Sequence, residues 1–443
     1  MVELIKEGVY LLNGSEFAKD AKGLPTPDEA RENTITYNIL RAHDVDGSKG
    51  NKMRIKFDAM MSHDITYVGI IQTARASGLE KFPLPYAMTN CHNSLCAVGG
   101  TINEDDHIFG LSAAKKYGGI YVPANVAVIH QFAREAMVKC GNMILGSDSH
   151  TRYGSLGNMG VGEGGGELVK QLLCNTWDIN APEVVLVWLE GAPRKGVGPH
   201  DVAISLVKAV FENGFVKNKV LEFAGPGVKN LPIDFRNGID IMTTETTCLS
   251  SIWITDEEVK KHYDTHRRGE FYKELRPGDV AYYDSMIRID LSKQESMIAL
   301  PYHPSNAVSI HELQANPEAV LRAVEEDTHK GYGDKVQIDL VSKVKNGKMV
   351  ADQGIIAGCA GGTYDNLAEA AAIMRGKSVG NDYFTMSAYP QSVPVYLATT
   401  RNHIAEVLLE AGVIIKWCIN WVAHPCLGSR CFAIFIIKAD VAK

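Results

Sequence analysis

The chain has 443 residues, enough for about three domains of ordinary size. Its 45 Lys and Arg residues against 52 Asp and Glu residues give a net charge of −7, and this mild acidity argues against nucleic acid or an anionic membrane as the main partner. Apolar residues make up 45% and charged residues 22%, so disorder, collagen-like structure and coiled coil are poor interpretations of the whole chain.

The N-terminal residues, the apolar runs and the cysteines indicate the cellular compartment of the protein. No apolar run approaches the roughly 20 residues of a membrane span, and the start has no basic region followed by an apolar core, so we expect no signal peptide. The nine cysteines are odd in number in a large chain, which favours reduced thiols, some of them metal-binding, over a secreted disulfide framework. We therefore expect a cytoplasmic protein.

The predicted elements alternate along the chain. Residues 1–50 are polar and rich in turn-forming residues, and we expect an irregular entry segment there. From about residue 54, short apolar runs alternate with segments of helical pattern, such as the predicted helix 126–140, the strand 143–146 and the strand 183–190. This alternation predicts an α/β fold in which helices flank parallel sheets.

Changes in composition near residues 195 and 305 predict three domains, over 1–195, 196–305 and 306–443. In the last of these, we expect strands at 336–341, 354–358, 383–387 and 393–397. Residues 417–443 hold two of the five tryptophans and three of the nine cysteines and end in a β-prone run. We expect this tail to diverge from the rest of the chain.

The strongest local pattern is Gly146-Ser-Asp-Ser-His-Thr151, which is followed by a glycine-rich stretch that ends at Gly166. A strand that runs into such a loop places polar side chains at the carboxyl edge of a parallel sheet, where open α/β folds bind ligands. A glycine-rich turn with a Ser or Asp cap is the alternative on spacing alone.

Two further segments carry titratable groups. His130 lies in a helical segment close to the strand that leads to Asp148, and an imidazole paired with that carboxylate can shuttle a proton. A satisfied structural histidine is the alternative, for His130 and equally for His92. Glu245 lies among hydroxyl residues, which predicts either a polar cleft or a helix cap.

Cys359 follows a predicted strand in a glycine-rich turn that opens a helix. Backbone amides and helix polarity at such a place favour thiolate over thiol. The position suits either a nucleophile or an iron–sulfur ligand.

Together and in this order, these segments resemble the aconitase superfamily of iron–sulfur hydro-lyases, over about residues 55–415. The resemblance implies a fold of three α/β/α domains with mainly parallel sheets. The matching motifs are the loop 146–151, Ile129-His130-Gln131, Met242 to Glu245, and Gly358-Cys359. Other segments, such as Ser62-His-Asp-Ile-Thr, are similar to a bacterial aconitase-like hydratase branch.

The resemblance also implies the chemistry. The reaction would be the reversible dehydration and rehydration of a hydroxy-polycarboxylic acid at a [4Fe–4S] cluster. The residues that it places in catalysis are His92, His130, Asp148, Ser149, His150 and Glu245. Asp148 would pair with His130 to move the proton of the leaving or entering water. Glu245 would pair with His150 in the same way, while His92 would lie near that water. Ser149 would hydrogen-bond the substrate.

Three cysteine thiolates would hold the cluster, and Cys359 matches the first of them. The other two belong to a C-G-P-C motif in the family, and this chain has Ala423-His-Pro-Cys426 in that frame. Cys426 keeps one ligand, and Cys418 or Cys431 is the candidate for the other. A second departure is Cys91, which stands where the family has a carboxylate next to the equivalent of His92.

The resemblance ends after Gly428, before the family's substrate-binding arginines and its C-terminal swivel domain, which supplies the catalytic base. Arg152, beside the loop motif, is either a contact for a substrate carboxylate or a surface residue.

Three interpretations of the whole chain stay open. The chain is an incomplete hydratase that is inactive alone, the large subunit of a split enzyme of the isopropylmalate dehydratase type that needs a small swivel subunit, or a non-catalytic remnant of the fold.

Overall fold

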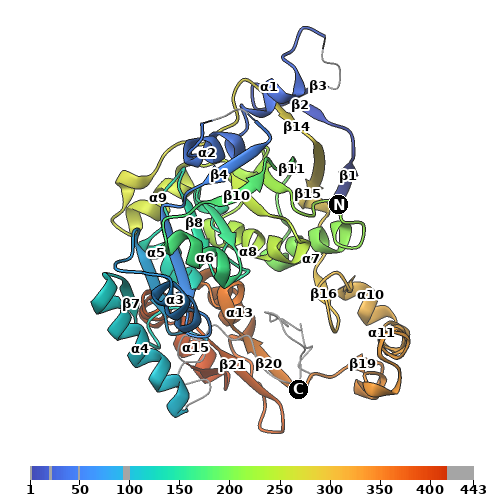
Figure 1. Ribbon diagram of the computed structural model, residues 1–443. Coiled ribbons are helices and arrows are strands. Elements are labelled where there is room, and N and C mark those ends of the chain that lie inside the picture. The colour runs from blue at the N-terminus through green and yellow to red at the C-terminus, as the bar shows by residue number, and fades with distance from the viewer. Residues whose placement is uncertain (1, 19–21, 48–49, 93–99, 417–443) are drawn as a thin grey trace.

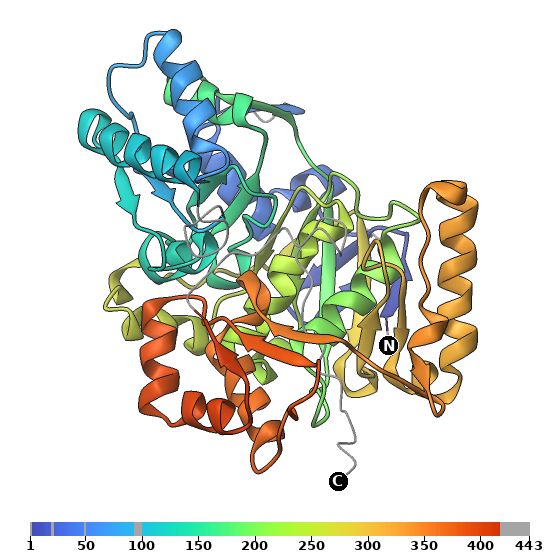
Figure 2. The same cartoon turned by 90° about the horizontal axis from the view of Figure 1, so that it is seen from below.

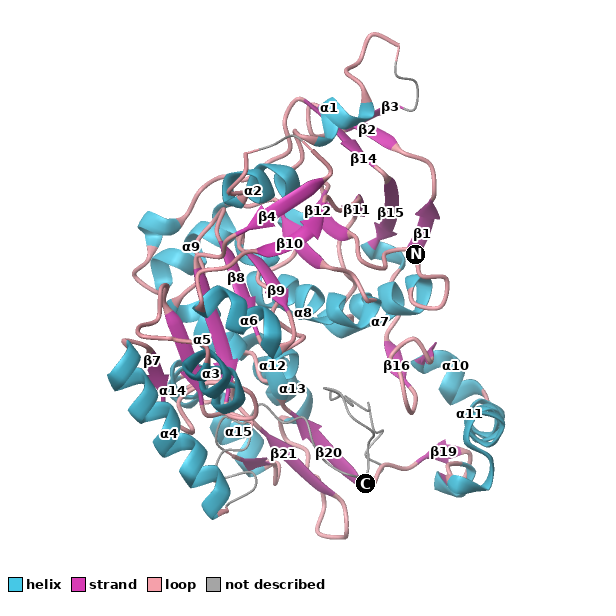
Figure 3. Cartoon of the chain, viewed as in Figure 1, coloured by secondary structure: helices cyan, strands magenta, loops and turns pink. Residues whose placement is uncertain are grey.

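The computed structural model describes residues 2–18, 22–47, 50–92 and 100–416. Within these residues, three sheets of mainly parallel strands carry the fold, and helices pack against them (Figure 1). Strands and helices alternate along most of the chain (Figure 3). The predicted α/β fold class is therefore confirmed.

The first sheet has the strand order β7-β6-β5-β8-β9, and all of its neighbouring strands are parallel. Its strands are β5 (Ala59–His63), β6 (Tyr86–Thr89), β7 (Ile120–Val122), β8 (Met143–Gly146) and β9 (Met159–Gly162). The helices against it are α3 (Tyr67–Ala76), α4 (Thr101–Tyr117), α5 (Ile129–Ala136) and α6 (Gly165–Leu172).

Both faces of this sheet are apolar because successive side chains of a strand point to opposite faces. On β5, Met60 packs in the same buried cluster as residues of α3, α4 and α6. Its neighbours Ala59 and Met61 pack instead with Ile129 and Ala133 of α5. Burial on both faces explains the continuous apolar runs in the sequence.

The second sheet has the order β1-β15-β11-β12-β13, and only the edge pair of β1 with β15 is antiparallel. Its strands are β1 (Val2–Ile5), β11 (Val184–Glu190), β12 (Val220–Ala224), β13 (Ser250–Trp253) and β15 (Ser285–Asp290). Helices α7 (Pro199–Val210) and α8 (Ile233–Met242) cover one face. The other face shares a buried cluster with α2 (Ile35–His43) and the first sheet.

The third sheet is smaller and joins β20 (Gln353–Ile356), β21 (Thr385–Ala388) and β22 (Ile414–Ile415) in parallel. Its helices are α12 (Gly358–Gly361), α13 (Tyr364–Met374), α14 (Val393–Arg401) and α15 (Ile404–Glu410). This unit docks on α8 and α5. The backbone N–H of Asp365 donates to Asp234 on α8 at 3.2 Å, and the N–H of Val128 donates to the carbonyl of Gln391 at 2.8 Å.

Short elements complete the chain. They are β2 (Val9–Leu12), β3 (Glu16–Ala18), β4 (Lys52–Ile55), β10 (Trp177–Asn180), β14 (Val280–Tyr283), β16 (Met297–Ala299), β17 (Ala307–Ser309), β18 (Val344–Lys345), β19 (Lys348–Met349), α1 (Pro27–Arg31), α9 (Glu257–Thr265), α10 (Ile310–Ala315) and α11 (Pro317–Tyr332). Figure 2 shows α10 and α11, in orange, at one edge of the molecule and apart from β20–β22. They pack around a small apolar cluster of their own.

Three local predictions were wrong. The entry segment 1–50 is not irregular, because β1 extends the second sheet and β2 pairs with β3 and β14. The predicted strand 336–341 does not form, because a carboxylate oxygen of Glu325 accepts the backbone N–H groups of Leu340 and Val341, at 2.6 and 2.9 Å. The predicted strand 393–397 is the start of helix α14, which is capped by the Ser392 hydroxyl and has Pro394 in its first turn.

The predicted domain boundaries stay a proposal. The second sheet takes β1 and β11 from before residue 195 and its other strands from after it. None of the described helices combines the length and the apolar character that a membrane-spanning helix requires.

Candidate functional site

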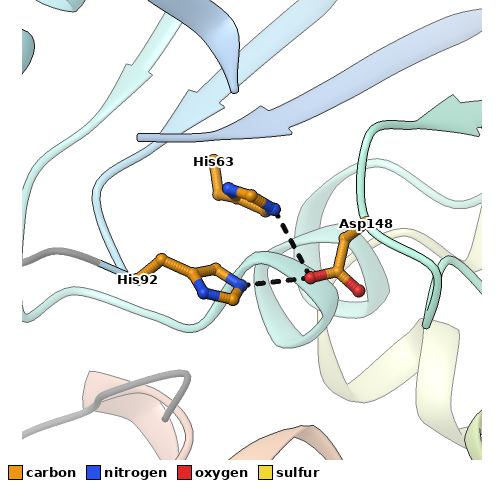
Figure 4. Close-up of side chains that lie close together, drawn as sticks. All are labelled: His63, His92 and Asp148. Atoms are coloured by element: carbon orange, nitrogen blue, oxygen red, sulfur yellow. Dashed lines mark hydrogen bonds and ion pairs between the residues drawn. The ribbon is translucent and has the colours of Figure 1, made fainter. Parts of the chain in front are cut away.

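Three neighbouring strands of the first sheet end at one place. His63 is the last residue of β5, His92 lies three residues beyond the end of β6, and Asp148 lies two residues beyond the end of β8. Because β6, β5 and β8 are adjacent and parallel, their carboxyl ends bring these side chains together at one edge of the sheet (Figure 4). All three residues are buried.

Asp148 is the centre of this group. Its Oδ1 lies 3.0 Å from Nε2 of His130 and accepts the backbone N–H of His150 at 2.8 Å. Its Oδ2 lies 3.1 Å from Nε2 of His92 and 3.6 Å from Nε2 of His63. One carboxylate therefore faces several imidazoles inside the protein.

The surroundings of Asp148 keep it ionised. Burial by itself raises the pKa of a carboxyl group, but the charge and hydrogen bond of His130, together with hydrogen bonds from His150 and His92, hold the pKa of Asp148 well below its usual value. A carboxylate in this state accepts hydrogen bonds through both oxygens and donates none.

His150 links Asp148 to a second carboxylate. Its Nδ1 lies 3.4 Å from Oδ1 of Asp148, and its Nε2 lies 3.3 Å from Oε1 of Glu245. Burial would lower the pKa of His150, but the nearby Cys359 thiolate, Asp148 and Glu245 outweigh it and hold the pKa well above its usual value. The imidazole thus holds its proton between two carboxyl groups.

His63 is in the opposite state. Burial, with added repulsion from His92, lowers the pKa of His63 to about 3. The ring is therefore neutral at physiological pH. A neutral imidazole offers one nitrogen as an acceptor or a metal ligand, unlike the protonated ring of His150.

Glu245 lies on a short 3₁₀ helix, Thr243–Thr246, directly after α8. Its Oε2 is 3.8 Å from Nε2 of His303, whose ring stacks on Phe211 with 3.7 Å between ring centroids. The hydroxyl of the preceding residue, Thr244, donates to the carbonyl of Ser149 at 2.6 Å. This bond ties the segment that carries Glu245 to the loop that carries Asp148.

Cys359 lies at the start of α12, is 1% exposed and is a free thiol. Its carbonyl accepts the side-chain amide of Gln391 at 2.6 Å and Nη1 of Arg134 at 3.3 Å. Burial lowers the pKa of the Arg134 guanidinium, and the charge of Cys359 opposes that shift. Cys359 thus interacts electrostatically with both His150 and a buried guanidinium.

Residues 37–430 of the chain match the family described as "Aconitase family (aconitate hydratase)". The chain belongs to the aconitase family. The predicted relationship is thereby confirmed.

Three relatives of this chain share about a quarter of their aligned residues with it. It is 27% identical over 317 residues to a 3-isopropylmalate dehydratase large subunit of Elusimicrobium minutum, a match that covers 71% of this chain and 66% of the relative. It is 24% identical to the protein of the same name in Clostridium kluyveri, covering 90% and 87%. Against the mitochondrial aconitate hydratase of Saccharomyces cerevisiae it is 23% identical, over 92% of this chain and 51% of the relative.

In this aconitase-family chain, the fold brings together most of the residues that the motifs predicted. His92, His130 and His150 all lie around Asp148, and Glu245 lies beyond His150. Ser149 is different, because its side chain is exposed and only its carbonyl has a bond to this group. The catalytic roles of these residues stay predictions.

The departure at Cys91 has a structural counterpart. Cys91 is buried, with Sγ 3.6 Å from the hydroxyl of Thr89. The carboxylate contacts of His92 come from elsewhere, since its backbone N–H donates to Asp64 at 2.9 Å and its ring faces Asp148. His92 is thus fixed in position although the adjacent residue is a cysteine.

Two other predictions concern cysteine and arginine. Cys418, Cys426 and Cys431 lie outside the described residues. The interpretation of Arg152 as a surface residue was wrong, because Arg152 is 4% exposed and donates to the carbonyls of Thr151 and Cys248 at 3.0 and 3.1 Å. It braces the loop motif against the segment after Glu245.

Sequence reasoning missed His63, Arg134 and His303 as neighbours of this site. His63 could have been found from the sequence, because it is the polar residue at the end of an apolar strand. Asp148 has a similar position after its own strand. Arg134 lies one turn after His130 on α5, which is also visible in the sequence. His303 had none, because only the tertiary fold brings it to Glu245.

Proposed function

We propose that this chain is the core of an aconitase-type hydro-lyase, which removes water from a small hydroxy-polycarboxylic acid and adds it back. The observation that carries the proposal is the chain of charges Asp148–His150–Glu245, buried at the carboxyl edge of a parallel sheet and placed next to Cys359. Membership in a family whose matching relatives are named hydratases and dehydratases supports it.

The residues of the chain have separate tasks in the dehydration direction. A base takes a proton from the neighbouring carbon, and the electron pair of that C–H bond forms the C=C bond. The C–O bond breaks, its electron pair leaves with the oxygen, and that oxygen takes a proton to form water. We assign this proton to the imidazole group around Asp148, with His150 holding a proton at Nε2 toward Glu245. The ionised Asp148 keeps the histidines in orientation and stabilises their protonated forms.

A [4Fe–4S] cluster, when bound, supplies the Lewis acid that makes hydroxide a tolerable leaving group. Cys359 suits one ligand position, because a buried thiol beside an imidazolium and a guanidinium favours the thiolate form. Cys426, with Cys418 or Cys431, is proposed for the other two positions.

A second candidate is the split form of the enzyme, in which this chain is a large subunit. The names of the relatives favour it, since most of the matching proteins cited above are large subunits of a dehydratase. In that case a small subunit would supply the swivel domain and the base that takes the proton from carbon. For either form we propose the cytoplasm as the compartment, because the five cysteines within the described residues are all free thiols, which suit a reducing environment.

The first test is the content of iron and acid-labile sulfide after anaerobic reconstitution, followed by the visible absorbance. About four irons per chain are expected. A Cys359→Ala variant should lose this iron, and an exposed Cys174→Ala variant should keep it. If the unaltered chain binds no iron, the hydro-lyase proposal gives way to the non-catalytic interpretation.

The second test is hydration of small unsaturated di- and tricarboxylic acids by the reconstituted chain, measured as loss of ultraviolet absorbance of the conjugated double bond. Activity of the chain alone supports a self-sufficient core. A cluster-bearing chain that is active only after a small swivel subunit is added supports the split form. A cluster-bearing chain with no activity in either preparation contradicts both.

A further inference from the structure

His63 is a buried imidazole that forms no hydrogen bond with the described residues. It is 5% exposed, and within the described part of the chain its Nδ1 has no hydrogen-bond partner. Its Nε2 lies 3.6 Å from Oδ2 of Asp148, which is too long for a hydrogen bond. An unsatisfied polar ring inside a protein is costly, so this side chain needs an explanation that the proton-transfer role of its neighbours does not provide.

The three side chains in Figure 4 converge on one small space. Nε2 of His63 and Nε2 of His92 both face Oδ2 of Asp148, at 3.6 and 3.1 Å. One possible ligand atom from each residue lies within 4.8 Å of the others. Around a divalent ion bonded at about 2.1 Å, neighbouring ligand atoms are about 3.0 to 3.4 Å apart. The separation of 3.1 Å lies within that range, and the separation of 3.6 Å lies just beyond it.

The three proposed ligand residues are also held in position by contacts with other residues. Oδ1 of Asp148 is fixed by His130 and by the backbone N–H of His150, so Oδ2 is the oxygen left to face the two rings. The backbone of His92 is tied to Asp64, and His63 is the last residue of a paired strand. Metal sites depend on such outer contacts, which orient the ligands before the ion arrives.

We propose that His63, His92 and Asp148 bind one first-row divalent cation in a site of two imidazole nitrogens and one carboxylate oxygen. This donor set suits Zn²⁺ or Fe²⁺, which take His and Asp ligands and leave a further position to water or substrate. The site needs no cysteine. It shares Asp148 and His92 with the proposed hydro-lyase site but does not depend on that function, because Oδ2 of Asp148 holds either the ion or a proton bridge to His92.

The test uses Zn²⁺ as the probe and the full chain with Cys359→Ala, so that no cluster can form. The chain is titrated with Zn²⁺ against a competing chelator. One tightly bound Zn²⁺ per chain is expected. Adding His63→Gln should weaken its binding by about tenfold or more, whereas the matched change His311→Gln, at an exposed imidazole of α10, should leave it unchanged. Equal affinities in these two variants would overturn the proposal.

X-ray absorption of the Zn²⁺-loaded Cys359→Ala chain decides the matter even if the His63 variant does not fold. Two imidazoles in the zinc shell and no sulfur near 2.3 Å are expected. A sulfur shell, fewer than two imidazoles, or no stoichiometric Zn²⁺ rules the site out. Neither experiment uses a substrate or a cluster, so their failure leaves the hydro-lyase proposal standing, and the loss of that proposal leaves this site untouched.

Discussion

Two buried carboxylates in neighbouring sheets of this protein have opposite surroundings. Asp148, after β8, faces titratable imidazoles, and its pKa is held well below the usual value. Glu222, on β12, is 0% exposed, and its hydrogen-bond donors within the described residues are all neutral. Burial raises the pKa of Glu222, and its hydrogen bonds do not reverse that shift. Burial alone therefore does not decide whether a carboxyl group is charged, because the partners decide it.

The partners of Glu222 show what a structural carboxylate looks like. It accepts the N–H groups of Ile35 and Thr36 at 3.1 and 2.9 Å, the hydroxyl of Thr36 at 2.8 Å and that of Tyr283 at 2.7 Å. These bonds attach the first turn of α2 and the end of β14 to the second sheet. Such donors are fixed, whereas the imidazoles around Asp148 can exchange protons, so only the Asp148 group is suited to chemistry.

The largest effect is expected for Asp148→Asn in the cluster-loaded protein. An amide cannot stabilise protonated imidazoles as a carboxylate does, so the hydration rate should fall by about 10² to 10⁴-fold. Initial rates measure it, with His311→Gln as the control. A rate within a factor of about two of the control would show that the Asp148 group takes no part in proton transfer.

Glu222→Ala should act on stability. It leaves several buried donors without an acceptor, and the free energy of unfolding should drop by about 4 kcal/mol. Urea unfolding followed by fluorescence measures this change. Glu222→Gln, which keeps one acceptor oxygen, should lose clearly less, and equal losses in the two variants would mean that packing and not hydrogen bonding is what Glu222 contributes.

The Asp148 group and Glu222 also differ in how they change the stability of the protein as the pH falls. The unfolded His63 takes up a proton below about pH 6.5, while the folded ring stays neutral down to about 3. At this site the unfolded state thus binds more protons in this window, so the contribution of His63 lowers the stability of the metal-free protein as the pH falls, by about 2 kcal/mol at pH 5. Asp148, with its lowered pKa, adds to the loss at more acidic pH.

The raised pKa of Glu222 has the opposite sign, since the folded state binds its proton more tightly and loses stability as the pH rises past the usual value for Glu. His63→Gln should therefore flatten the acid side of the stability profile, and Glu222→Gln should not. Urea midpoints of the metal-free protein between pH 7 and pH 5 measure both. An unchanged acid slope in His63→Gln would contradict the neutral state of that ring.

The smallest effect is expected for Tyr283→Phe, which removes one of the hydrogen bonds to Glu222 and leaves the ring in place. A loss of about 1 to 2 kcal/mol of unfolding free energy follows from one hydrogen bond to a buried acceptor. Thermal unfolding monitors it, and the hydration rate should stay at the control value. A loss as large as that of Glu222→Ala is the result that this account does not allow.

Much of the site could be predicted because its residues lie in short motifs at the ends of apolar strands. Asp148, Ser149 and His150 follow β8 directly, and Cys359 follows β20. The misses have two kinds of cause. At the start of α14, Ser392 and Pro394 are a helix-start signal that is visible in the sequence. The prediction of a strand at 393–397 gave more weight to the apolar residues there. The absence of the predicted strand at 336–341 depends on Glu325, whose contact with this segment joins separate elements and is contained in no local pattern.

The sequence by itself determined the α/β alternation, the polar motifs that follow apolar strands and the family, because these depend on periodicity and on contiguous motifs. Only the tertiary structure decided the state of each group. The neutrality of His63, the protonation of His150 and the burial of Arg152 arise from burial and from charges that lie far apart in the sequence. Electrostatic energy depends on distance in space and on the exclusion of water, and neither can be read from the sequence alone.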